Sequence, residues 1–182
     1  MNHQKRYLAL GPRTIPSPES ISKEAREALE RLIGDDGIPL YARYDMPSPD
    51  DAAGWMNMKA AANAQYAAAM KELAGGLRDT VTTIEAEHAT IHVATPEGPF
   101  SPRHAMIDLH GGALVFGGGE TCRVGARTQA DRHGVRCYGI DYRMPPEHPY
   151  PAALDDCMTA YRYILERHEP GEMPVGMVEH AG

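Results

Sequence analysis

The chain has few cysteines, no long apolar run and no basic run. Its three cysteines, Cys122, Cys137 and Cys157, are an odd number without a close pair, which argues against a disulfide framework and a four-ligand zinc site. No apolar stretch approaches the roughly 20 residues of a membrane-spanning helix, so no membrane partner is expected. The formal charge is −7 and is spread along the chain, which argues against a nucleic-acid partner.

The composition is that of an ordinary globular protein. The 182 residues are 42% hydrophobic and 24% charged, enough for one domain with a core. Residues 1–6 are charged but are followed by proline-rich sequence in place of the apolar core of a signal peptide. We therefore expect a cytoplasmic location.

The first 75 or so residues favour two helices. The first is predicted to start at Ser17-Pro18-Glu19, with serine as N-cap and proline at the first helical position, and to end at Gly34. The second starts in the same way at residues 48–51 and ends at Gly75-Gly76. Both helices carry apolar faces that must pack on something.

From Thr80 the pattern changes to strands that alternate with helices. A hairpin is expected over residues 81–94, and further strands over residues 105–109, 135–142 and 175–178. Helices are expected at residues 120–133 and from Pro151. The apolar face predicted for the last helix consists of Leu154, Cys157, Met158, Tyr161, Ile164 and Leu165. This alternation predicts an α/β fold with a mainly parallel sheet and helices on both faces.

A glycine motif, His110-Gly111-Gly112-Ala113, directly follows the strand at residues 105–109. Small residues there let backbone N–H groups face outward. Two such donors that converge on one point form an oxyanion hole, which stabilises the charge on a carbonyl oxygen under attack. Taken alone, the four residues fit a glycine-rich turn without function equally well.

A second motif, residues 141–156, reads Asp-Tyr-Arg-Met-Pro-Pro-Glu-His-Pro-Tyr-Pro-Ala-Ala-Leu-Asp-Asp. It closely resembles the signature after the fourth core strand of the hormone-sensitive-lipase-like esterases of the α/β-hydrolase superfamily. The glycine motif of that family also lies upstream, as His110 does in this chain. The resemblance implies a helical cap region at residues 1–76 and the first part of an α/β-hydrolase core at residues 77–182.

The resemblance also implies roles for single residues. Gly112 and Ala113 would supply oxyanion N–H groups, and Ala113, which replaces the third glycine of the family, can donate if its φ is negative. His110 and Gly111 would shape the turn. Residues 141–156 would order the loop behind the site without taking part in catalysis. Neither a metal nor an organic cofactor is implied.

The nucleophile of the family has no counterpart in the sequence. The family acts through a serine in a Gly-x-Ser-x-Gly elbow, and none of the five serines lies in that pattern. Residues 178–182 resemble the family's Gly-Asp-Ser-Ala-Gly, with His180 at the serine position. Imidazole cannot readily replace a serine alkoxide there. We therefore expect this chain to supply cap and oxyanion hole but no nucleophile, and to be inactive alone.

The function implied is short-chain carboxylic-ester hydrolysis by serine acyl transfer, with a small ester as substrate. The alternative is a catalytically inactive hydrolase-like fragment or pseudoenzyme that binds a small ligand or a partner chain. In either case the last strand is expected to be an open sheet edge, which predicts a companion chain or self-association.

Two further patterns are weaker. His88 and His92 share a strand face without a third ligand, so a structural role is expected instead of a metal site. Gly117-Gly118-Gly119 precedes a helix but lacks the residues of a phosphate-binding loop, so it is expected to be a loop beside the acyl pocket.

Overall fold

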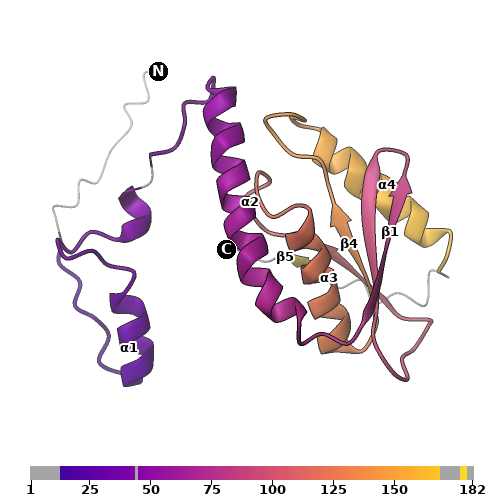
Figure 1. Ribbon diagram of the computed structural model, residues 1–182, viewed down its shortest axis with the longest axis horizontal. Coiled ribbons are helices and arrows are strands. Elements are labelled where there is room, and N and C mark those ends of the chain that lie inside the picture. Colours follow the sequence, from indigo (N-terminus) through magenta and orange to yellow (C-terminus); the bar gives the residue numbers. More distant parts are fainter. Residues whose placement is uncertain (1–12, 44, 169–176, 180–182) are drawn as a thin grey trace, which may run out of the picture. The chain divides into compact units, whose positions relative to one another are not determined.

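The computed structural model describes residues 13–43, 45–168 and 177–179. The chain divides into two compact units, residues 1–46 and 47–182 (Figure 1). The expected boundary between cap and core, at residues 76 and 77, lies inside the second unit. The assignment of residues 1–76 as a cap stays a prediction.

The first unit holds one α-helix, α1, over Lys23–Glu30, and a short 3-10 helix over Leu40–Arg43. The expected helix start at Ser17 is wrong. Ser22 is the N-cap, because its hydroxyl accepts a hydrogen bond from the Ala25 N–H at 3.2 Å. The 3-10 helix lies between the two helices that the sequence predicts.

The second unit begins with α2, Ala52–Ala74, whose N-cap Asp51 accepts a hydrogen bond from the Gly54 N–H at 2.8 Å. Gly75 ends the helix as expected. This helix starts three residues after the predicted Ser48, because the carboxylate of Asp51 caps it. Among the described residues, no helix is both long and apolar enough to cross a membrane.

Five strands form one sheet: β1 (Thr80–Ala86), β2 (Ala89–Thr95), β3 (Ala105–Leu109), β4 (Arg136–Asp141) and β5 (Met177–Glu179). Their order is β1-β2-β4-β3-β5. β2 is antiparallel to both of its neighbours, and β3 is parallel to β4 and to β5. The expected hairpin is confirmed. The expectation of a mainly parallel sheet is wrong, because two of the four strand pairings among the described residues are antiparallel, both made by β2. The last strand was predicted from residue 175, but residues 175 and 176 lie outside the described residues.

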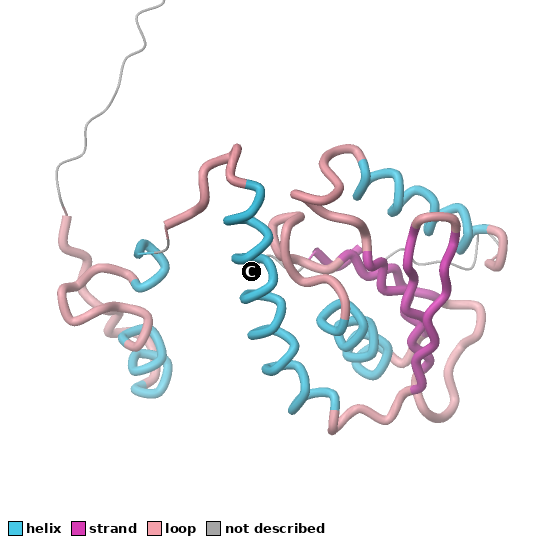
Figure 2. Tube along the Cα trace, turned by 45° about the horizontal axis from the view of Figure 1, so that its top comes forward, coloured by secondary structure: helices cyan, strands magenta, loops and turns pink. Residues whose placement is uncertain are grey.

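Helices cover both faces of the sheet (Figures 1 and 2). α3, Glu120–His133, packs on one face and α4, Ala152–Leu165, packs on the other, while α2 packs against α3. Strand alternation separates the two cores. One holds Val93, Ile107, Tyr138, Ala160 and Ile164, and the other holds Ala94, Cys137, Ala126 and Ala130.

The predicted apolar face of α4 is wrong for three of its six residues. Leu154, Met158 and Tyr161 are exposed by 52%, 40% and 37%. The buried stripe instead contains Asp156 and Ala160 as well as Ile164. Because Asp156 is held by Arg143, a carboxylate occupies the buried face, which hydrophobic spacing alone cannot reveal.

Candidate active site

The glycine motif forms a tight turn directly after β3, and we call residues 110–117 the oxyanion turn. The Gly112 carbonyl accepts hydrogen bonds from the N–H groups of Val115 at 3.0 Å and Phe116 at 2.9 Å. Gly112 has a φ of +117°, and a Cβ at this position would collide with the Phe116 carbonyl. Only glycine fits there.

Ala113 and Leu114 continue the turn with φ values of +53° and +58°. The negative φ on which donation by Ala113 was made conditional is therefore not found, and the role of its N–H depends on whether that group is left without a partner. In this conformation the chain folds back on the Gly112 carbonyl within four residues. Among the described residues, the N–H groups of Gly112 and Ala113 donate to no other group, so both donors are available to a bound oxygen atom.

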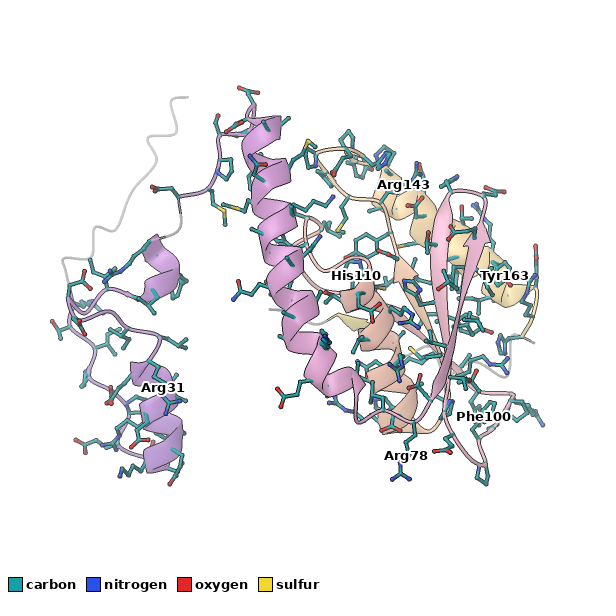
Figure 3. All side chains as sticks on the ribbon, viewed as in Figure 1. Arg31, Arg78, Phe100, His110, Arg143 and Tyr163 are labelled. Carbon is teal, nitrogen blue, oxygen red and sulfur yellow. The ribbon has the colours of Figure 1, made fainter. Side chains whose placement is uncertain are left out.

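His110 fixes the start of the turn. Its ring is buried, stacks on the Tyr142 ring at 4.2 Å between centroids, and forms a hydrogen bond between Nδ1 and the Gly111 carbonyl oxygen at 2.9 Å. The Tyr142 hydroxyl donates to the His110 carbonyl oxygen at 2.5 Å. Burial lowers the pKa of His110, so the ring is neutral at neutral pH. Figure 3 shows His110 in the interior of the second unit.

α2 holds the loops around the turn through two polar side chains that sequence reasoning missed. The Asn63 side-chain oxygen accepts a hydrogen bond from the Gly117 N–H at 2.9 Å. Lys59 Nζ donates to the Pro145 carbonyl at 3.2 Å and to Glu147 Oε2 at 2.8 Å. The available signal was two polar residues four positions apart, on one face of an alanine-rich helix.

The second motif ties the end of β4 to both neighbouring helices. Asp141 Oδ2 accepts from the Gly119 N–H at 2.9 Å and lies 3.6 Å from His92 Nε2. Burial raises the pKa of Asp141, but the nearby His92 ring and the hydrogen bond from the Gly119 N–H outweigh it and lower the pKa overall. Arg143 forms a two-pronged ion pair with Asp156, at 2.8 Å for Nη2.

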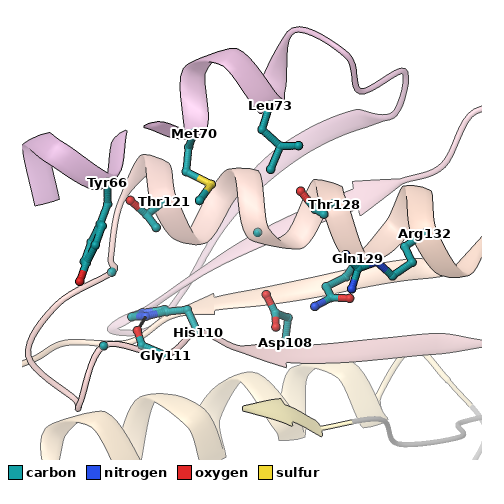
Figure 4. Close-up of a pocket in the computed structure, with 13 residues that line it drawn as sticks. Tyr66, Met70, Leu73, Asp108, His110, Gly111, Thr121, Thr128, Gln129 and Arg132 are labelled. Atoms are coloured by element: carbon teal, nitrogen blue, oxygen red, sulfur yellow. Dashed lines mark hydrogen bonds between the residues drawn. The ribbon is translucent and has the colours of Figure 1, made fainter. Parts of the chain in front are cut away.

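A cavity of about 370 Å³ lies beside the oxyanion turn (Figure 4). Apolar side chains of α2, namely Tyr66, Met70 and Leu73, line one side. The backbone of Gly111, Gly112 and Gly117 and residues of α3 line the other sides. The oxyanion turn thus faces a space that can hold a small molecule. Of the glycine tract at residues 117–119, expected in a loop beside a pocket, Gly117 lines this cavity, and Gly118 and Gly119 line a second one.

Two other expectations on site residues concern histidines. His180, expected at the nucleophile position, lies outside the described residues. His88 and His92 lie beside different carboxylates. His88 Nε2 lies 3.4 Å from Asp156, and His92 Nε2 lies 3.6 Å from Asp141.

Comparison with known proteins identifies this architecture. Residues 106–178 match the sequence model of a family described as having an α/β-hydrolase fold. An acetyl-hydrolase of Streptomyces hygroscopicus is 36% identical over 77 residues, which are 42% of this chain and 24% of that protein. A carboxylesterase of Mycobacterium tuberculosis, NlhH, is 42% identical over 61 residues, 34% of this chain and 19% of that protein.

A solved structure of an esterase, E25, superimposes with a TM-score of 0.75 at 27% identity, over 94% of this chain and 52% of that one. This chain therefore spans about half the length of that structure, and the matched segments span a quarter or less of the two curated relatives. The resemblance to α/β-hydrolase esterases and the expected fold class are confirmed.

Proposed function

We propose that the chain acts in carboxylic-ester hydrolysis and supplies the oxyanion hole, and its likeness to an esterase structure over 94% of its length supports this. One observation carries the proposal: the N–H groups of Gly112 and Ala113 have no partner among the described residues, and Gly112 lines the 370 Å³ cavity. Donors fixed in advance at the place where charge develops need no reorganisation during the reaction. The names of the relatives support the same reaction class.

The mechanism follows from the turn. A small ester lies in the cavity with its carbonyl oxygen between the two N–H groups. Attack by a serine hydroxyl turns that oxygen into an oxyanion, and the charge is held by Gly112 and Ala113. Loss of one such donor in other hydrolases costs on the order of 10²–10³ in rate. No serine of this sequence lies in an elbow pattern, so the proposal assigns it the oxyanion hole and not the nucleophile.

The oxyanion hole is tested by amide NMR on the full chain, titrated with butyrate as a short acyl carboxylate. We expect the Gly112 and Ala113 amide signals to shift in a saturable manner. Gly112→Ala, whose methyl group collides with the Phe116 carbonyl, should abolish the shifts. Amides that stay unshifted in the folded wild-type chain contradict the oxyanion hole.

The nucleophile is tested separately by hydrolysis of nitrophenyl butyrate, with a serine-directed phosphonate as control. We expect no phosphonate-sensitive turnover from this chain alone. Turnover that the phosphonate inhibits would support ester hydrolysis and would contradict the assignment that this chain has no nucleophile. Butyrate binding without turnover is the result that also fits an inactive ligand-binding relative. The expected companion chain and cytoplasmic location stay predictions.

A further inference from the structure

A cluster of three ligating side chains lies behind the oxyanion turn. His110 follows β3, Cys122 lies in the first turn of α3 and Asp141 ends β4. One ligand atom from each lies within 4.8 Å of the other two. Cys122 is fully buried and His110 is 7% exposed. The proposed hydrolysis gives Cys122 no task.

The hydrogen bonding of His110 prepares it as a ligand. Its Nδ1 is engaged with the Gly111 carbonyl oxygen, which can only accept, so the proton of the neutral ring lies on Nδ1. Nε2 then carries the lone pair, and this atom is buried without a hydrogen-bond partner among the described residues. Histidines that bind metals have this arrangement, in which the second ring nitrogen donates to a backbone carbonyl.

The Asp141 carboxylate is held in a similar way. The Gly119 N–H anchors one carboxylate oxygen of Asp141 at 2.9 Å. His92 adds a fourth ligand atom, because its Nε2 lies 3.6 Å from the same oxygen and has no hydrogen bond. Its Nδ1 contacts the Thr83 hydroxyl at 3.0 Å, which orients the ring.

We propose that His110, Cys122 and Asp141 bind a Zn²⁺ ion, with His92 or water completing four ligands. Zinc accepts thiolate, imidazole and carboxylate at bond lengths of about 2.0–2.3 Å, so its ligands lie roughly 3.3–3.8 Å apart. The ligand atoms now lie within 4.8 Å of one another, so the longest of these distances shortens by about 1 Å when the ion binds. The ion replaces the thiol proton of Cys122, which is released to solvent.

The ion has an approach from two sides. His110 and Thr121 line the 370 Å³ cavity, and Asp141, Gly118 and Gly119 line a second cavity of about 580 Å³. Bound zinc would join the oxyanion turn to α3 and β4. Occupancy of the site therefore fixes the position of the turn independently of any ester.

Calorimetric titration of the chelator-treated full chain with Zn²⁺ tests the site. We expect one equivalent to bind to the wild type and to Cys157→Ala, a control cysteine on α4 outside the cluster. Cys122→Ala should weaken binding at least tenfold, and circular dichroism confirms that each variant is folded. Equal affinity in Cys122→Ala, or no binding to the folded wild type, overturns the proposal.

Cobalt provides a readout that does not depend on variants. Co²⁺ bound at this site should give a thiolate-to-metal absorption band in the wild type and in Cys157→Ala. Absence of that band overturns the proposal even if Cys122→Ala fails to fold. Asp141→Asn, which keeps the side-chain shape, is the second variant and should also weaken Zn²⁺ binding.

Discussion

At the scale of single residues, the oxyanion turn is defined by backbone angles. Gly112, Ala113 and Leu114 all have positive φ, although two of them carry a Cβ. The sequence showed which N–H groups could act but not the angles at which the chain holds them. The reason is that a left-handed alanine is favoured only by the surrounding hydrogen bonds, which join residues of different elements.

Ala113→Gly should relieve this strain. A left-handed alanine costs about 1 kcal/mol, and glycine recovers this while losing up to about 1 kcal/mol of chain entropy. We expect the free energy of unfolding to stay equal or rise by at most about 1 kcal/mol, with the butyrate-induced amide shifts retained. Ala113→Val, which adds a β-branched side chain, should lower it by about 1–2 kcal/mol. Urea denaturation measures both, and a stable Ala113→Val variant would contradict the strained turn.

Tyr142→Phe tests the anchor of the turn. The variant keeps the stack on His110 but leaves the buried His110 carbonyl without the tyrosine donor. We expect a loss of about 1–3 kcal/mol in stability and shifted amide signals at Gly112 and Ala113. Tyr138→Phe is the matched control, because its buried hydroxyl contacts His168 at 2.9 Å, away from the turn. If both variants shift the amide signals of Gly112 and Ala113 equally, Tyr142 is not the specific anchor of the turn.

At the scale of elements, α2 acts as a brace for two loops. Its sequence is alanine-rich, and Lys59 and Asn63 reach residues 144–147 and Gly117. Its bounds could be predicted from caps and glycines, since these signals are local. The hydrogen bonds of Lys59 and Asn63 could not be predicted, because each joins residues more than 50 positions apart.

Glu147→Gln should reveal the brace through pH. The hydrogen bond from Lys59 lowers the pKa of Glu147 in the folded chain. A carboxyl with a lowered pKa adds stability above its unfolded pKa of about 4.3 and loses it as the pH falls through the folded value. At pH 7 the wild type should therefore unfold at a higher urea concentration than Glu147→Gln. This difference in midpoint should disappear below about pH 4. Glu97→Gln, at an exposed loop acid, is the control, and a gap that persists in acid contradicts the prediction.

At the scale of the whole molecule, one buried ion pair joins the sheet to α4. Asp156 is fully buried and accepts from the Arg143 N–H at 2.7 Å as well as from the guanidinium. Asp156→Ala should cost about 3 kcal/mol, since it leaves a charge and an N–H without their acceptor. Asp155→Ala removes the same charge from the exposed neighbour and should cost less than about 0.5 kcal/mol. Thermal unfolding of the two variants compares them, and similar costs would show that net charge, not the buried pair, matters.

Sequence periodicity predicted the α/β class, the hairpin and the helix at residues 120–133, because each depends on near neighbours. Periodicity did not predict that Leu154, Met158 and Tyr161 are exposed, since both faces of α4 carry apolar residues at helical spacing. The His110–Cys122–Asp141 cluster also escaped it, because three elements far apart in the sequence meet only in the fold. The division at residue 46 follows from contacts and leaves no mark in composition.

The strand order carries a consequence for how the chain reaches this structure. β4 lies between β2 and β3, although residues 96–135 separate it from β2 in sequence. Until β4 arrives, the hairpin is a two-stranded ribbon and β3 has neither of its neighbours, because β5 also comes later. Closing so long a loop is slow compared with forming a hairpin. Insertion of β4 should therefore set the folding rate, and substitutions that weaken β4 should slow refolding more than those in β1.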